Sequence, residues 1–188
     1  MRRTALALAS AALLLSVAAC GSSDGQAGSG SSAKAVDAGP HNAADATFAQ
    51  EMVPHHRQAV AMVEMTKGHD LDPEVQRIVD AIGSTQSGEI DQMVGWLKGW
   101  GEKVPAEDSP MRMQGMLSSD ELDQLRETGD PAFQGLWLSR MVGHHQGAIP
   151  MAQTEIDDGE NPKAIRLARE IIETQKAELD EMAGLIGQ

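Results

Sequence analysis

Apolar residues recur at intervals of three and four along two long stretches of the chain, a spacing that places them on one face of an α-helix. Each stretch follows a residue suited to capping and a proline, Asp72-Pro73 in one case and Asn161-Pro162 in the other. Such a pair is typical of the first turn of a helix. The apolar positions of the two predicted helices are Val75, Ile78, Val79, Ile82, Ile90, Met93 and Leu97, and Ile165, Leu167, Ala168, Ile171, Ile172, Leu179, Met182, Leu185 and Ile186.

These two helices belong to a longer internal match, which is visible when the chain is laid on itself with an offset of 89 residues and no gap. Comparison of residues 52–97 with residues 141–186 gives 15 identities in 46 positions. The identities include a Met-Val-x-His-His segment, which begins at Met52 in one copy and at Met141 in the other. We interpret the chain as a tandem duplication of a helical hairpin.

Two such hairpins predict an all-α domain, a ferritin-like four-helix bundle with one long crossover connection. The first repeat is expected at about 45–100, the crossover at 101–129 and the second repeat at about 130–188. Asp45 is the expected N-cap of the first helix, and Asp130 before Pro131 is the expected cap of the third. Within the crossover, Ser118 and Glu121 form a capping-box pattern that predicts a short helix to about Glu127.

The first nineteen residues have the anatomy of an export signal. Two arginines are followed by an apolar stretch from about residue 5 to residue 17, which is too short to favour a membrane-spanning helix. Val17-Ala18-Ala19-Cys20 resembles a bacterial lipobox, in which the cysteine is acylated and becomes the first mature residue. We therefore predict a lipoprotein signal peptide at 1–19, with an ordinary cleaved signal as the alternative.

Residues 20–44 are rich in Gly, Ser and Ala and carry almost no large apolar side chain, so they predict a flexible tether. Cys20 is the only cysteine of the chain and is expected to carry the lipid that attaches the protein to the outer face of the cell membrane. An extracytoplasmic location follows, and the mature domain would have no free thiol for chemistry.

Composition limits the remaining choices. The 188 residues leave room for one domain beside the signal. A formal net charge of −13 argues against nucleic acid as a partner and favours a cationic ligand. Aromatic residues make up 3% of the chain and tyrosine is absent, which disfavours a β-sandwich or barrel.

The candidate chemistry lies in the duplicated methionine and histidine motif. Residues at i, i+3, i+7 and i+10 of a helix share one face, and this spacing joins two methionines, one histidine and a small alanine in each copy. The residues on these faces are Met52, His55, Ala59 and Met62, and Met141, His144, Ala148 and Met151. Thioether and imidazole donors without a thiolate suit a soft ion, and they predict a Cu(I) site that another soft metal could also use.

Further candidates surround this face. His56 and His145 are about 100° further round the helix, so they point at a neighbouring helix or outward. Outer partners that could orient the imidazoles recur at i and i+3 of the second helix in each copy. These are Gln86 and Glu89, and Gln175 and Glu178.

The crossover contributes a cluster of methionines that could form an accessory metal site or a lid, Met111, Met113 and Met116. Burial under a loop folded over the bundle would also account for the cluster. His41 and His69 stand apart from the motif, and both are expected to be ordinary solvated residues.

Three segments resemble the bacterial Domain of Unknown Function 305 family: residues 51–62, Gly115-Met116-Leu117-Ser118, and residues 141–152. The resemblance extends over about 44–187. It implies a ferritin-like four-helix bundle, a secreted or periplasmic location, and copper binding, since some members are copper-binding proteins associated with copper resistance.

We therefore predict a lipid-anchored extracytoplasmic protein that sequesters or transfers Cu(I), with a copper donor or acceptor protein as partner. Binding is favoured over catalysis. One alternative is a structural or interaction bundle without metal. A di-metal ferritin-like oxidase is the other, and it is disfavoured because the Glu-x-x-His pairs of that class are missing: Glu51 precedes His55 by four positions.

Overall fold

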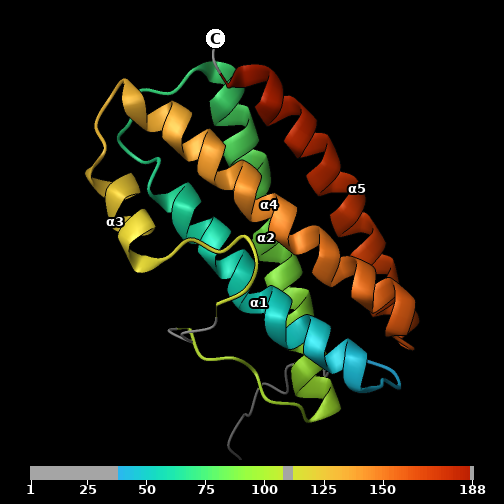
Figure 1. Ribbon diagram of the computed structural model, residues 1–188. Coiled ribbons are helices and arrows are strands. Elements are labelled where there is room, and N and C mark those ends of the chain that lie inside the picture. Colours follow the sequence, from blue (N-terminus) through green and yellow to red (C-terminus); the bar gives the residue numbers. More distant parts are fainter. Residues whose placement is uncertain (1–37, 108–111, 187–188) are drawn as a thin grey trace, which may run out of the picture. The chain divides into compact units, whose positions relative to one another are not determined.

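The computed structural model describes residues 38–107 and 112–186, and this part of the chain forms five helices and no strand (Figure 1). The predicted signal peptide, Cys20 and Met111 lie outside the described residues. None of the described helices is long and apolar enough to cross a membrane. The helices are α1 (Ala43–Glu64), α2 (Pro73–Trp100), α3 (Ser119–Glu127), α4 (Ala132–Asp158) and α5 (Pro162–Leu185).

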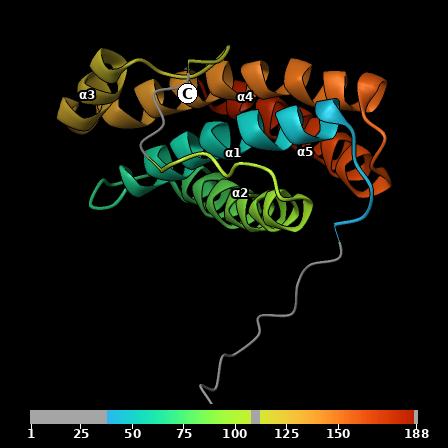
Figure 2. The same ribbon diagram turned by 90° about the horizontal axis from the view of Figure 1, so that it is seen from below.

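The four long helices form two hairpins, α1 with α2 and α4 with α5, so the all-α prediction is confirmed. The hairpins meet mainly through α1 and α4, whereas α2 and α5 touch each other at few points. Figure 2 shows the two hairpins as packed layers, with the short helix α3 beside one end of α4. The α1–α4 contact is therefore the seam that joins the two halves of the bundle.

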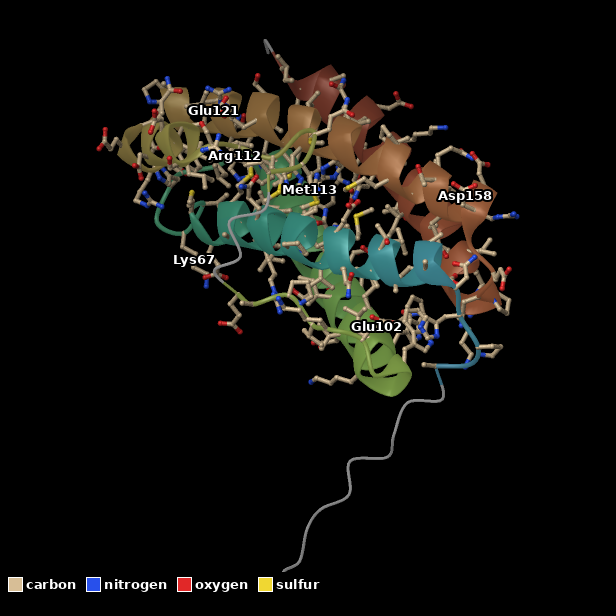
Figure 3. All side chains as sticks on the ribbon, turned by 60° about the horizontal axis from the view of Figure 1, so that its bottom comes forward. Lys67, Glu102, Arg112, Met113, Glu121 and Asp158 are labelled. Carbon is tan, nitrogen blue, oxygen red and sulfur yellow. The ribbon has the colours of Figure 1, made fainter. Side chains whose placement is uncertain are left out.

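The crossover between the hairpins runs along α1 before it reaches α3. Gln50 and Arg57 of α1 donate hydrogen bonds to its backbone carbonyls, Gln50 to Lys103 and Arg57 to Pro105 and Ala106. In Figure 3 the labelled Met113 lies farther along the crossover, over the α1–α4 seam. The crossover thus covers the outer side of this seam.

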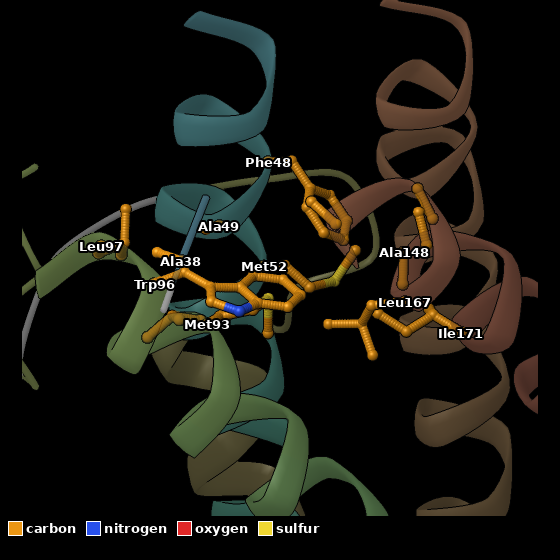
Figure 4. Packing of buried hydrophobic residues seen from close by; sticks show 14 residues of the cluster. Ala38, Phe48, Ala49, Met52, Met93, Trp96, Leu97, Ala148, Leu167 and Ile171 are labelled. Atoms are coloured by element: carbon orange, nitrogen blue, oxygen red, sulfur yellow. The ribbon is translucent and has the colours of Figure 1, made fainter. Parts of the chain in front are cut away.

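Two hydrophobic clusters fill the bundle, and positions 89 residues apart occupy corresponding places in them. The first cluster contains Phe48, Met52 and Met93, and Figure 4 shows it around Trp96. The second cluster contains the counterparts of these three residues, Trp137, Met141 and Met182. Each cluster joins the first part of one long helix of the seam to the last part of the other. The clusters therefore lie on opposite sides of the middle of the seam.

The first helix begins earlier than the sequence predicts. Asn42 is the N-cap of α1, and Asp45 stands three positions later as the acidic member of a capping box. Ala38 is buried, and the Asn161 side chain donates hydrogen bonds to the carbonyls of Ala38 and Pro40. Residues 38–44, which we expected in the flexible tether, are therefore part of the packed structure.

The other predicted helix starts have mixed outcomes. The capping box of Ser118 and Glu121 and the N-cap Asn161 are confirmed. Asp72 precedes α2 as predicted, but its side chain accepts from Gln134 instead of capping the helix. The prediction that Asp130 caps α4 is wrong, because its carboxylate accepts hydrogen bonds from the His69 ring and the Asp70 backbone N–H.

Asp45 has a second role that the sequence did not reveal, because it is buried against another carboxyl group, that of Glu155 near the end of α4. Burial and the neighbouring Asp45 raise the pKa of Glu155 to about 8. Burial also opposes ionisation of Asp45, but hydrogen bonds from the Asn42 backbone, the Glu155 side chain and the Asn161 backbone outweigh it and lower the pKa of Asp45. At neutral pH protonated Glu155 donates its hydrogen bond to ionised Asp45.

This shared proton predicts that the bundle loses stability in mild alkali. An acid whose folded pKa is raised contributes stability below its unfolded pKa, and this stability is lost as the pH rises through the folded pKa. Between pH 6.5 and 8.5 the free energy of unfolding should fall by about 1 to 2 kcal/mol in wild type. Glu155→Gln, which keeps a donor facing Asp45, should show little of this fall in urea denaturation. Asp157→Asn changes an exposed carboxylate of α4 that lies outside the Asp45–Glu155 contact, and it should behave as wild type. An equal alkaline fall in Glu155→Gln and wild type would contradict the shared proton.

Candidate metal centre

The middle of the α1–α4 seam is occupied by two imidazole rings, those of His55 and His144. Their ring centroids are 3.9 Å apart, with 41° between the ring planes, and neither side chain has any exposed surface. The two histidines stand 89 residues apart in the chain, so each helix contributes the same position of its motif. The sequence places each histidine on the motif face of its own helix but leaves open whether the two copies share one site, and the packing brings the two rings together.

Most nitrogens of this imidazole pair lack a hydrogen-bond partner. His55 Nε2 lies 3.3 Å from the backbone carbonyl of Gln114, but His55 Nδ1 and both ring nitrogens of His144 have no partner of acceptable geometry. Buried polar groups are nearly always satisfied, and exceptions require an explanation such as a ligand. The donor set of the pair thus fits an ion that binds imidazole nitrogen.

The protein holds these two rings neutral. Burial, together with repulsion from the neighbouring histidines, lowers the pKa of His55 to about 3 and the pKa of His144 well below its usual range. A neutral imidazole presents a free electron pair, which is the form that binds metals. At neutral pH neither ring needs to lose a proton before it binds an ion.

The second histidine of each motif points at the neighbouring helix of its own hairpin. His56 Nε2 lies 2.7 Å from a carboxylate oxygen of Glu89 on α2, and His145 Nε2 lies 2.7 Å from one of Glu178 on α5. Both imidazoles are fully buried, whereas the carboxylates of Glu89 and Glu178 are 12% and 13% exposed. The expected outer partners therefore orient the second histidines and not the central pair.

Gln86 and Gln175 lie one turn before these carboxylates, on α2 and α5. Both amides are buried, and their side-chain oxygens have no hydrogen-bond partner. The second helix of each hairpin thus also contains a buried amide with an unsatisfied oxygen.

The predicted methionines flank the imidazole pair along the bundle. Met52 belongs to the first hydrophobic cluster and Met151 packs against it, while Met62 and Met141 belong to the second cluster. The structure therefore combines the first methionine of one motif with the last methionine of the other. Met52, Met62 and Met141 are fully buried, and Met151 is half-buried.

A strap formed by residues 112–118 of the crossover covers the pair from outside. The Gln58 side chain fixes the strap, since it accepts from the Leu117 N–H at 2.7 Å and donates to the Leu117 carbonyl at 3.0 Å. Met113 and Met116 of the strap are half-buried, as a covering loop would leave them. Gly147 lies against the Gln114 carbonyl, and a Cβ at Gly147 would be 2.0 Å from that oxygen.

Gln58 and Gly147 are separated by 89 residues, so they occupy the same position in the two repeats. They contact the strap in different ways. The Gln58 amide forms hydrogen bonds with the strap, whereas Gly147 leaves room for the strap backbone because it has no side chain. The sequence contains both residues, but only the path of the crossover shows that they act on the same segment.

The remaining histidines are not simply solvated, so that expectation is wrong. His41 stacks on Trp100 at 4.5 Å between ring centroids and lies near Glu102, and His69 stacks on Phe133 at 3.5 Å. Both are half-buried at the margins of the bundle, away from the imidazole pair. They provide comparison histidines for experiments on the centre.

Within the described ranges, no group of three or more His, Cys, Asp or Glu side chains is placed to hold one metal ion. An ion at the centre would therefore rely on imidazole pairs and on thioethers, not on a carboxylate cage. This donor set differs from that of the di-metal carboxylate proteins.

Fold and centre together define a four-helix bundle with a buried histidine and methionine interior. The chain belongs to the Domain of Unknown Function 305 family, whose sequence profile, described as "Domain of unknown function (DUF305)", matches residues 45–186. No curated protein matches the chain in a sequence search.

Solved structures of similar proteins agree with this membership. A DUF305 protein from Streptomyces coelicolor is 33% identical, with a TM-score of 0.70 over 76% of this chain and 89% of that one. A DUF305 fragment from Deinococcus radiodurans is 30% identical, with a TM-score of 0.72 over 79% and 99%. CopM in its Cu(I)-bound form is 30% identical, with a TM-score of 0.64 over 75% and 94%, and it is also solved with Cu(II) and with silver. These structures support a metal-binding role at the level of the family.

The close approach of the strap can be tested with two glycines of α4. Gly147→Ala should lower the free energy of unfolding by about 2 kcal/mol or more, because its Cβ meets strap backbone that cannot move aside locally. Gly143→Ala meets nothing within 4 Å and should instead raise stability by up to about 1 kcal/mol through helix propensity. Urea denaturation of both variants measures the difference. Equal stability of the two would show that the strap is not seated on Gly147.

Proposed function

We propose that this protein binds Cu(I) as cargo at the imidazole pair of His55 and His144, on the extracytoplasmic side of the membrane. The observation that carries the proposal is the pair itself: two neutral, fully buried imidazoles in contact, with three ring nitrogens lacking a partner. Such nitrogens are costly in a protein interior unless a ligand uses them.

The surrounding donors favour a soft ion. Thioether sulfur and imidazole nitrogen select Cu(I) and similar ions, and buried methionines stand on both sides of the pair in the two hydrophobic clusters. CopM, a similar structure, is solved in Cu(I)- and silver-bound forms, which supports the same class of ion for this chain.

Burial suits sequestration and controlled transfer. All four motif histidines have no exposed surface, so a bound ion would be shielded from water and from oxidants in solution. Release would then require a partner protein or a change in the protein around the site. The proposed role is accordingly to hold Cu(I) and to hand it to an acceptor, without catalysis.

Removal of both central imidazoles tests this proposal. In the His55→Gln/His144→Gln variant, which keeps polar side chains of similar size, Cu(I) affinity should fall at least about 100-fold, because both nitrogen donors are lost. The measurement is anaerobic competition with a Cu(I) chelator, accompanied by circular dichroism to verify helix content.

The matched control is His41→Gln/His69→Gln, which removes two histidines that stack at the margins of the bundle. This variant should hold Cu(I) as tightly as wild type. Equal losses in both double variants, or no binding by wild type, would refute the proposed site.

We further propose that the bundle is tethered by lipid at Cys20, which follows the signal-like residues 1–19. In a host that processes lipoproteins, full-length protein should fractionate with membranes. Cys20→Ser should release it into the soluble extracytoplasmic fraction, whereas Ser22→Ala should remain on the membrane. Fractionation and immunoblotting decide between these outcomes, and a wild-type protein already in the soluble fraction would contradict the anchor.

A further inference from the structure

The imidazole pair is fully buried, so an ion can reach it only along a path through the bundle wall. On the outer side of the α1–α4 seam this path is closed by the strap, whose Gln114 carbonyl is seated on Gly147 and whose Leu117 is held twice by Gln58. A cavity of about 250 Å³ beside the strap is lined by Arg140 and Glu121, which pair with each other at 2.7 Å, so its charged lining has no surplus carboxylate to attract a cation. Entry on this side is therefore unfavourable.

A second cavity, of about 360 Å³, lies between the first part of α1 and the last part of α4. It is lined by apolar residues such as Phe48 and Met151 and by two acidic residues, Glu51 and Glu155, neither of which forms an ion pair with a motif histidine. Phe48 and Met151 lie at the first hydrophobic cluster, so this cavity borders apolar packing and does not border the imidazoles.

The side of the bundle opposite the strap, formed by α2 and α5, has a groove of about 400 Å³ between these two helices. We call this side the inner side of the seam. Glu178 lines this groove and at the same time contacts His145 Nε2 at 2.7 Å. His145 is fully buried, and its Nδ1 has no hydrogen-bond partner. One carboxylate thus connects solvent in the groove with a buried imidazole next to His144.

The charge of the groove favours cations. Glu173, Glu178 and Glu181 line it, and the cation in its wall, Arg77, is paired with Glu181 at 3.3 Å. Carboxylates in a cleft with low-dielectric walls concentrate cations and accelerate their association. Apolar Ile78 and Ala81 supply such a wall.

We infer that the α2–α5 groove is the entry path for the cation and that Glu178 receives it there and directs it to His145 and the imidazole pair. This inference rests on the proposed Cu(I) site and adds the route by which that site fills. Glu178 is a residue of the path, so its charge governs the rate of loading, whereas the imidazole pair governs the affinity.

The experiment measures the rate of anaerobic Cu(I) loading by stopped-flow tryptophan fluorescence, since Trp137 lies in the cluster beside the centre. Glu178→Gln keeps a polar contact to His145 and removes the charge, and it should slow loading at least about fivefold at low ionic strength. Added salt should reduce this difference. Equilibrium affinity, from chelator competition, should change less than about threefold. Glu170→Gln, an exposed change on the same helix outside the groove, should load as wild type.

A steric variant provides an independent arm. Ala81→Phe fills the groove from α2 without a change in charge and should also slow loading. Gln58→Ala removes the two hydrogen bonds to Leu117 but leaves the Gln114 carbonyl seated on Gly147, so the outer side stays covered and the loading rate should be unchanged.

Unchanged loading by both Glu178→Gln and Ala81→Phe, or faster loading by Gln58→Ala alone, overturns the inference and leaves the Cu(I) site standing. A loss of affinity in Glu178→Gln equal to its loss of rate also overturns it, because Glu178 would then be part of the binding site. Failure of wild type to bind Cu(I) in the competition assay refutes the proposed function itself.

Discussion

The bundle is organised around a polar contact at the point where its two halves cross. A helical seam normally packs aliphatic side chains at its centre, yet here His55 and His144 face each other in a volume that excludes water. Their unsatisfied nitrogens cost free energy, so the hydrophobic clusters on both sides must stabilise the fold against this cost. Ala59 and Ala148, each four residues after a central histidine, are small and fully buried.

The two sides of the seam differ because the bundle is nearly symmetric but has one crossover, which covers only one side. On the outer side the strap meets Gln58 and Gly147, positions 89 residues apart, and is clamped by one and accommodated by the other. On the inner side each second histidine meets a partly exposed carboxylate of its own hairpin. The backbone of the strap thus covers one side of the imidazole pair. On the other side, partly exposed carboxylates contact the second histidines, so the two sides differ in their access to solvent.

Helical periodicity predicts much of this arrangement, since spacing alone places His55 and the motif methionines on one face of α1. The spacing could not show which methionines share a cluster, because that depends on the antiparallel crossing of α1 and α4. It also left the direction of His56 and His145 open, since the rotation of each helix decides which neighbour a side chain meets.

Other features depend on contacts between distant parts of the chain. Asn42 and Asp45 are both suitable caps, and the backbone of Asn161, far along the chain, is one of the partners of Asp45. The burial of Glu155 beside Asp45 could not be predicted, because nothing in the sequence around either residue indicates the contact. The importance of Gly147 arises only from the path of the strap.

The central claim is that the ion binds at the imidazole pair, and histidine ring nitrogens report this directly. The chain has six histidines, and ¹⁵N-histidine labelling with nuclear magnetic resonance can follow each of them during titration with Ag(I), a diamagnetic soft ion. The account predicts that ring nitrogens of His55 and His144 shift first, while those of His41 and His69 stay unchanged. Shifts confined to His41 and His69, or an absence of any shift at His55 and His144, would contradict it.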